Sequence, residues 1–235
     1  MRVLKFGGSS LATAERFKQV AQIIKDKSQT SKVAVVVSAP QGVTNHLVAM
    51  AENISDEEKL STDLQLFKTA IDTIIDDLSA SLDGFNRQHA EQALANAEHQ
   101  LSRYMQGVTM LSFCPEHIRA RIISTGERLS VAILESVFAA LGSEVSLLAP
   151  EKFLFTSDES LNAVADLVLS KEKYAELYSQ CKQIAIMPGF FGVNCRGEVT
   201  TLGRNGSDYS AAVLAVCAEA ECCEIWTDVD GVFNA

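Results

Sequence analysis

The chain has 235 residues, of which 47% are hydrophobic and 21% charged, a balance typical of a globular chain with enough core for one or two domains. Its 20 basic and 30 acidic residues give a net charge of −10, so no overall field attracts nucleic-acid phosphates or anionic lipid. The longest apolar runs, 33–37 and 211–218, are far shorter than the roughly 20 residues of a membrane-spanning helix. The composition therefore predicts a soluble chain with no nucleic-acid partner and no membrane contact.

The cysteines and the N-terminus indicate the compartment. Six cysteines form no C-x-x-C pair and no paired spacing with histidine, so neither a zinc site nor a disulfide framework is expected. The N-terminus reaches Gly7 and Gly8 before a hydrophobic signal region could form. We expect reduced thiols and a cytoplasmic location.

Short β-rich runs alternate with helical patterns, which is typical of a mainly parallel sheet with helices on its faces. Phe17, Val20, Ala21 and Ile24 form one stripe of a helix at 14–27 that connects the first two strands. Residues 56–141 are nearly all helical, with breaks expected at Gly84, Gly107 and Pro115. The expected strands are 2–6, 33–38, 144–148, 183–188 and 222–228, with a hairpin over 191–203 that turns at 194–197 beside the sheet. One α/β domain with a helical insert is predicted.

The first glycine loop, Lys5-Phe6-Gly7-Gly8-Ser9-Ser10, lies between a strand and a helix. Glycines let backbone N–H groups approach a ligand closely, and a following helix directs its positive end to the same place. A lysine at the strand end adds a full charge, so the loop favours phosphate binding. A glycine turn with a serine helix cap explains the loop equally well, and it matches neither the P-loop nor the dinucleotide-binding pattern.

The second glycine loop, Gly203-Arg204-Asn205-Gly206-Ser207-Asp208, precedes an apolar helix expected at 209–218. Ser207 or Asp208 could cap that helix, but a cap does not explain Arg204, whose planar fork suits a carboxylate. In Ser124-Thr125-Gly126-Glu127-Arg128, Ser124 and Glu127 fit a capping box. The adjacent Glu127 and Arg128 could instead bind the ammonium and carboxylate groups of a substrate.

Two further segments follow strands, where ligands bind in open α/β sheets. Trp226-Thr227-Asp228-Val229-Asp230-Gly231-Val232 ends the last strand in an acidic turn and lacks the spacing of a calcium-binding loop. Ser38-Ala39-Pro40 and Val43-Thr44-Asn45 follow the second strand, and either could be an ordinary turn and helix start.

Taken together, these segments resemble aspartokinases, of the amino acid kinase superfamily, in the family's order. The runs 44–50, 203–212 and 222–232 are similar to the kinase part of bifunctional aspartokinase/homoserine dehydrogenases of the threonine-sensitive form. The resemblance covers essentially the whole chain. It departs from the family at Ser9, where threonine is common, at Asn205, where single-function members have glycine, and at Phe233, where tyrosine is usual.

The resemblance implies a three-layer α/β sandwich with a mainly parallel central sheet and a helical insert. It implies transfer of the γ-phosphoryl group of ATP to the side-chain carboxylate of L-aspartate, the first step towards threonine, methionine and lysine. Mg²⁺ is expected to bind mainly through the nucleotide phosphates, and the full protein to be a homo-oligomer, a dimer or a tetramer.

The same resemblance implies roles for individual residues. Lys5 is expected to stabilise the transferring phosphoryl group, and Asp208 to order that lysine and metal-bound water. Gly7, Gly8 and Ser9 cradle phosphate, and Ser38 and Gly206 line its path. Aspartate is held by Thr44, Glu127, Arg204 and Ser207, with Arg204 on its α-carboxylate and Glu127 near its ammonium or orienting Lys5. The nucleotide is bordered by Trp226, Thr227, Asp228 and Phe233.

The family continues beyond Val232 with a further ATP-binding segment, regulatory ACT domains and the dehydrogenase, and residues 1–235 contain none of them. We therefore expect an aspartokinase catalytic domain that is incomplete at its C-terminus, with weak or no activity. Two alternatives stay open. The chain could be a kinase for another small acid, such as glutamate or acetylglutamate, or a nucleotide- or substrate-binding module without turnover.

Overall fold

A parallel sheet forms the centre of the molecule. The structure is a computed structural model that describes residues 1–178 and 181–227. Within them, the main sheet has the strand order β3-β4-β2-β1-β7, with every neighbouring pair parallel. The strands are β1 (Arg2–Phe6), β2 (Val33–Val37), β3 (Val145–Leu147), β4 (Ile184–Pro188) and β7 (Cys222–Trp226). These bounds agree with the predicted strands to within about two residues at each end, except that Asp228 lies outside the described residues.

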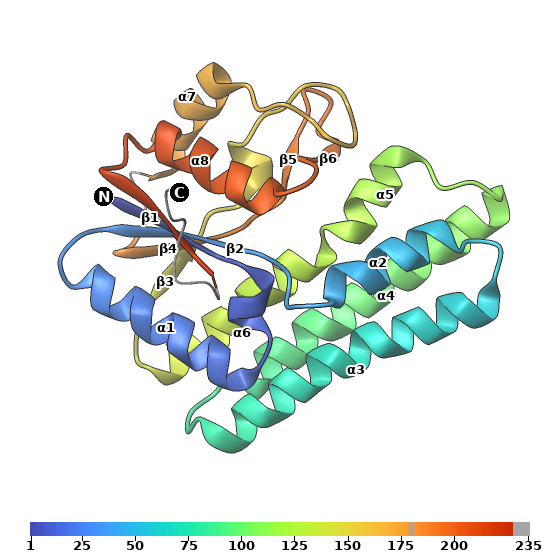
Figure 1. Ribbon diagram of the computed structural model, residues 1–235, viewed down its shortest axis with the longest axis horizontal. Helices are drawn as coiled ribbons and strands as arrows, with labels where there is room; N and C mark the ends of the chain where they lie inside the picture. Colours follow the sequence, from blue (N-terminus) through green and yellow to red (C-terminus); the bar gives the residue numbers. More distant parts are fainter. Residues whose placement is uncertain (179–180, 228–235) are drawn as a thin grey trace, which may run out of the picture.

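Helices cover both faces of this sheet, as Figure 1 shows. On one face lie α1 (Ala14–Ser28) and α6 (Thr125–Ala140), and on the other lie α7 (Leu167–Tyr178) and α8 (Gly206–Cys217). Because both faces are covered, the strands carry apolar side chains in both directions, and all five residues of β2 are buried. The predicted three-layer α/β sandwich is confirmed.

The helical insert lies between β2 and α6 in the sequence and extends away from the sheet (Figure 1). It consists of α2 (Val43–Glu52), α3 (Glu57–Ser81), α4 (Arg87–Leu111) and α5 (Glu116–Ile123). The breaks predicted at Gly84 and Pro115 are confirmed, but the one at Gly107 is wrong because α4 continues through it. None of the described helices has the length and apolarity that crossing a bilayer requires.

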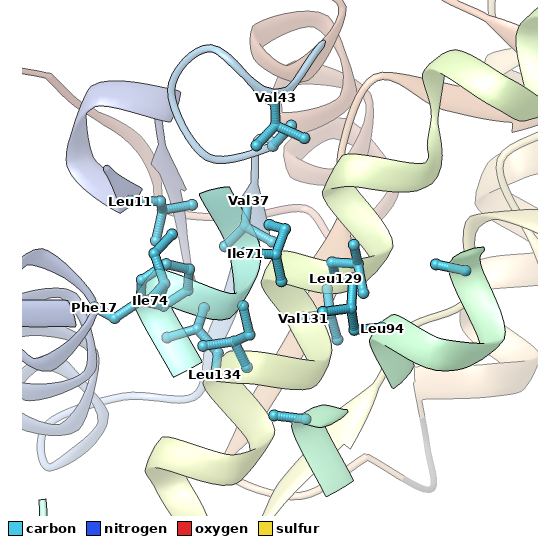
Figure 2. Close-up of a cluster of buried hydrophobic side chains, with 14 of the residues drawn as sticks. Leu11, Phe17, Val37, Val43, Ile71, Ile74, Leu94, Leu129, Val131 and Leu134 are labelled. Carbon is cyan, nitrogen blue, oxygen red and sulfur yellow. The ribbon is translucent and has the colours of Figure 1, made fainter. Parts of the chain in front are cut away.

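One hydrophobic core joins the insert to the sheet. Figure 2 shows Ile71 and Ile74 of α3 in the same cluster as Val37 of β2 and Leu134 of α6. Phe17 of α1 is fully buried there, which confirms the predicted stripe of that helix. A second cluster on the opposite face packs β1, β2 and β4 against α7 and α8.

Shorter elements complete the fold. The predicted hairpin is present as β5 (Phe191–Val193) and β6 (Val199–Thr201), antiparallel and separate from the main sheet. Two single-turn 3₁₀ helices, η1 (Gly8–Leu11) and η2 (Pro150–Lys152), follow β1 and β3. Because η1 intervenes, the first glycine loop does not lead directly into α1, whose cap is Thr13 rather than a serine of the loop.

Candidate active site

A cleft of about 400 Å³ opens at the carboxyl ends of β1, β2 and β4. The loops that follow β1 and β2 lead to helices on one face of the sheet, whereas the chain after β4 leads to α8 on the other. Ligands of open α/β sheets bind in crevices of this kind. Nine of the residues predicted as site residues line the cleft: Lys5, Gly8, Ser38, Thr44, Glu127, Arg204, Gly206, Ser207 and Asp208.

Lys5 reaches this cleft because of the alternation of side chains along β1. Val3 belongs to the hydrophobic cluster on the α8 face, and Lys5, two residues later, lies on that same face. Its Nζ forms an ion pair with Asp208 Oδ1 at 2.6 Å, and the lysine is only 9% exposed. A side-chain carbon added at Gly7 would lie 3.5 Å from that Nζ, so Gly7 lies beside the ammonium without lining the cleft.

Two helices that begin at the cleft, α2 and α8, have no side chain capping their first turn. Their cap positions, Gly42 and Asn205, line the cleft, and neither residue forms a side-chain cap hydrogen bond. By contrast, α1, α3 and α4 are capped by Thr13, Asp56 and Asn86. The uncapped helix starts therefore direct N–H groups and positive dipole ends into the cleft, which favours anionic ligands. The helices α5 and α6 also lack a side-chain cap, but their cap positions, Pro115 and Ser124, do not line the cleft.

Glu127 is the buried carboxyl group of the site. It is 3% exposed, and burial raises its pKa to about 7, against the opposing effects of its own and the Ala39 backbone N–H groups and of the Arg128 charge. Its Oε2 is buried without a hydrogen-bond partner. A buried oxygen that lacks a partner in the protein is available to a cationic or hydrogen-bonding ligand group.

The segment 38–40, which follows β2 and which we call the corner after β2, packs against α6 and holds this carboxyl in place. Ser130 lies one helical turn after Glu127, and its buried Oγ donates a hydrogen bond to the Ser38 carbonyl at 2.7 Å. A Cβ at Gly126 would lie 2.6 Å from the Cβ of Ala39, so only glycine allows this approach of α6 to the corner. The sequence Gly126-Glu127 therefore combines a packing requirement with a polar group that faces the cleft.

Arg204 lies at the exposed rim of the cleft and has no carboxylate partner among the described residues. The next residue, Asn205, has a φ of 57°, a left-handed conformation that glycine adopts readily and asparagine tolerates. That conformation explains how asparagine can stand at the position where the resemblance leads us to expect glycine. Because Asn205 occupies the cap position of α8, the alternative that Ser207 or Asp208 caps this helix is wrong, and both residues line the cleft.

Neither of the two alternatives for the segment 124–128 is found. No capping box forms, because Ser124 Oγ donates to the Arg121 carbonyl at the junction of α5 and α6. Arg128 does not face the cleft: it forms an ion pair with Glu151 and stacks on the ring of Phe191. Consecutive helical residues point about 100° apart, so Glu127 and Arg128 cannot grip one small ligand together.

The predicted nucleotide-bordering residues are only partly described. Trp226 ends β7, stacks on Phe6 with ring centroids 5.9 Å apart, and accepts a hydrogen bond from Gly7 N–H through its carbonyl. Thr227 is exposed directly after it. Neither residue lines the cleft, nor does Ser9. Asp228 and Phe233 lie outside the described residues.

Phe190 is a cleft residue that the sequence reasoning missed. It follows β4, has a φ of 78°, and is held by a hydrogen bond from its N–H to Ser210 Oγ at 2.9 Å. Positive φ is strained for a bulky residue and is common at functional sites. Its position after a parallel strand could have identified it from the sequence, because the loop after β4 opens at the same edge of the sheet as the loops after β1 and β2.

The described residues contain no group of three or more His, Cys, Asp or Glu side chains that could hold a metal ion. In the cleft, Asp208 is the partly exposed carboxylate, with 44% of its side chain accessible, and Lys5 already pairs with it. The donor set therefore fits a metal ion only where most of its ligands come from a bound substrate.

Comparison with known proteins gives a consistent result. A model of the amino acid kinase family matches residues 1–235. A bifunctional aspartokinase/homoserine dehydrogenase of Buchnera aphidicola is 40% identical over 236 residues, and one of Haemophilus influenzae is 38% identical over 238 residues. Each alignment covers 100% of this chain and 29% of the relative. An aspartokinase of Rickettsia prowazekii is 32% identical, with 99% of this chain and 40% of the relative covered.

Solved structures share the fold. Aspartokinase III of E. coli, in a complex with lysine and aspartate, has a TM-score of 0.84 and 28% identity to this chain. The same enzyme with aspartate and ADP has a TM-score of 0.83. Both matches cover 98–99% of this chain and 50% of the other.

Proposed function

We propose that this chain, which belongs to the amino acid kinase family, transfers the γ-phosphoryl group of ATP to the side-chain carboxylate of L-aspartate. The observation that carries the proposal is the cleft itself, where Lys5, Arg204 and the uncapped starts of α2 and α8 surround the buried carboxyl of Glu127. The aspartokinases similar to this chain support the choice of substrate. The chain spans 29% of the length of the two bifunctional relatives, so their whole activity is not transferred to it.

The reaction needs charge compensation more than proton transfer. The aspartate side chain has an ordinary pKa near 3.9, so its carboxylate is already ionised at neutral pH and requires no general base. This agrees with a cleft that none of the four histidines lines. The obstacle is the approach of two anions, which positioning and fixed positive charge overcome.

The phosphate end of the cleft lies at Lys5. In the proposed mechanism the Lys5 ammonium stabilises charge on the transferring phosphoryl group, while Asp208 holds that ammonium in position through the 2.6 Å ion pair. Gly8, Ser38 and Gly206 lie on the path of the phosphates, with Gly7 and Ser9 adjacent to it. The adenosine would extend towards Trp226 and Thr227 at the end of β7.

The aspartate end lies between α2, α6 and α8. We assign Arg204 to the α-carboxylate, because its fork is free of carboxylate partners among the described residues. Glu127 is assigned to the ammonium. Of its two predicted roles, the ammonium contact is the better supported, since Lys5 pairs with Asp208. Thr44 and Ser207 add hydroxyl groups at the starts of α2 and α8.

Mg²⁺ is compatible with this cleft if ATP supplies most of its ligands. ATP phosphate oxygens would hold most of the metal's coordination positions, and Asp208, the partly exposed carboxylate of the cleft, would accept hydrogen bonds from its water; the ion would supply positive charge against the phosphates. Cytoplasmic location and homo-oligomeric assembly stay predictions of the sequence.

Titration calorimetry with Mg²⁺, a non-hydrolysable ATP analogue and amino-acid ligands tests the proposal. We expect L-aspartate to bind more tightly than L-glutamate or N-acetylglutamate. Arg204→Lys should weaken aspartate binding about tenfold, because the charge remains but the two-pronged contact is lost. The matched variant Arg196→Lys, at the hairpin where Arg196 pairs with Asp158 and Glu198, should leave binding unchanged.

Two results would contradict the assignment. Binding of glutamate or acetylglutamate as tight as that of aspartate would favour a kinase for another acid. Equal aspartate affinity in Arg204→Lys and the parent chain would remove Arg204 from the substrate site.

A further inference from the structure

A second cavity, of about 340 Å³, lies against the first turn of α6. Its walls come from α4, the end of α5 and the start of α6, and it shares no lining residue with the active-site cleft. At 3.6 residues per turn, the α6 residues that line it, Thr125, Arg128 and Leu129, fall on the face opposite to Glu127. We call it the α4–α6 cavity.

Arg121 gives this cavity a positive charge that no carboxylate balances. Among the described residues, its guanidinium has neither an ion-pair partner nor a hydrogen-bond acceptor. The other arginines without such a partner, Arg16, Arg103 and Arg204, are exposed, whereas Arg121 is half-buried. Two of these four arginines, Arg121 and Arg204, line cavities. Arg204 belongs to the proposed substrate site, so the unpaired guanidinium of Arg121 indicates a second site that could bind an anion.

The remaining charges of the cavity cancel. Arg128 lies at its edge and forms an ion pair with Glu151, which also lines the cavity. The lining therefore carries one net positive charge in a chain whose net charge is −10. One positive charge suits a monoanion better than a phosphate dianion or a cation.

The rest of the lining is amphipathic. Asn96 and Gln100 of α4 supply side-chain amides, while Ala93, Ala97 and Leu129 supply apolar surface. The volume lies at the lower end of the range found for small-molecule sites, which are mostly apolar with a few placed polar groups. We propose that the α4–α6 cavity binds a small organic carboxylate, with its carboxylate on Arg121 and its apolar body against Ala93, Ala97 and Leu129.

Fluorine NMR with para-fluorobenzoate tests the site, because this probe combines one carboxylate with an apolar ring. We expect saturable binding to the chain, weakened about tenfold by Arg121→Gln, since a charge-assisted bidentate contact is lost. The neutral probe para-fluorobenzyl alcohol should bind more weakly than the carboxylate. Arg103→Gln, which removes an exposed arginine of α4 outside the cavity, should leave the affinity unchanged.

Arg204→Gln tests whether the probe binds in the active-site cleft, which Arg204 lines, rather than in the α4–α6 cavity. This substitution should not change the affinity for the probe. If Arg121→Gln does not fold, Arg121→Lys keeps the charge without the fork and should give an intermediate affinity. The proposal is overturned if the probe shows no saturable binding, if Arg121 variants bind it as tightly as the parent chain, or if Arg204→Gln abolishes binding.

Discussion

Lys5 is a lysine that the fold buries and pairs, rather than one exposed at the surface. It is 9% exposed and lies 2.6 Å from Asp208, at the point where β1 ends. A charge held in this way stabilises an anion that develops during reaction without first having to be ordered. We therefore expect Lys5 to act on the transition state rather than on substrate binding.

We predict that Lys5→Ala lowers kcat for aspartyl phosphate formation by a factor of about 10² to 10³, while the affinity for aspartate changes little. Steady-state kinetics measures the loss in kcat, and calorimetry on the same preparation measures the affinity for aspartate. Lys18→Ala, which removes an α1 lysine paired with Glu15, is the control and should leave both values unchanged. Equal losses in rate and in aspartate affinity would contradict the assigned role.

The raised pKa of Glu127 leads us to predict a specific dependence of stability on pH. Burial raises its pKa from 4.5 to about 7. Between these values the folded state keeps a proton that the unfolded state has lost, so the free energy of unfolding falls as the pH rises through this window. A shift of this size corresponds to a loss of about 3 kcal/mol. Above about pH 7 the carboxylate is ionised in both states and the loss is complete.

Glu127→Gln should remove this dependence. We expect the variant to gain stability relative to the parent chain as the pH is raised, as measured by urea unfolding at a series of pH values. Glu135→Gln, at a half-exposed carboxyl of the same helix, controls for the loss of one acidic residue. A difference between Glu127→Gln and the parent chain that stays constant with pH would show that Glu127 is not held protonated by burial.

At the scale of elements, two glycines in helices have opposite roles. Gly126, in the first turn of α6, lies so close to the corner after β2 that a Cβ would be 2.6 Å from Ala39 Cβ and 3.0 Å from Val43 Cγ1. Gly107, inside α4, has nothing within 4 Å of the same position. The first glycine allows close packing, whereas the second only weakens its helix.

We therefore predict opposite effects of the same substitution. Gly107→Ala should stabilise the chain by about 0.5–1 kcal/mol, because alanine loses less conformational entropy in a helix. Gly126→Ala should destabilise it and weaken aspartate binding, because α6 must move away from the corner that holds Glu127. Thermal unfolding measures the first effect and calorimetry the second. A stabilising Gly126→Ala with normal aspartate binding would contradict the close contact.

These glycines also show what the sequence could and could not predict. The strands were predictable because runs such as Val33–Val37 are apolar and β-branched, and the glycine loops because they follow strands whose carboxyl ends must share one edge. The break at Gly107 was wrong because a helix penalty of about 1 kcal/mol is outweighed by the buried neighbours Met105 and Val108. Phe190 was missed because its positive φ depends on contacts with Ser210 and Gly206 from distant sequence.

At the scale of the whole molecule, the insert and the sheet share a core. Ile71 of α3 is fully buried in the cluster that contains Val37 of β2 (Figure 2). A shared core of this kind favours unfolding in one cooperative step. The single tryptophan, Trp226, lies in the sheet, so its fluorescence reports on the sheet. The two longest helices, α3 and α4, lie in the insert and contribute strongly to the far-UV circular dichroism.

We predict that tryptophan fluorescence and far-UV circular dichroism give the same urea-unfolding curve. Ile71→Ala should shift both curves together, with a loss of about 2–5 kcal/mol. Leu66→Ala, at a position of α3 that is 47% exposed, is the matched control and should shift neither curve appreciably. Loss of helical signal before any change in fluorescence would show that the insert unfolds independently.

The central claim is that the cleft at the carboxyl ends of β1, β2 and β4 phosphorylates aspartate. The most direct test incubates the chain with Mg²⁺, ATP, L-aspartate and hydroxylamine, which displaces phosphate from the acyl phosphate and leaves aspartyl hydroxamate as the product to be measured. We predict aspartyl hydroxamate from the parent chain, far less from Lys5→Ala, and little product with L-glutamate or N-acetylglutamate. Equal amounts of aspartyl hydroxamate from the parent chain and from Lys5→Ala, or more product with L-glutamate or N-acetylglutamate than with L-aspartate, would contradict this function of the cleft.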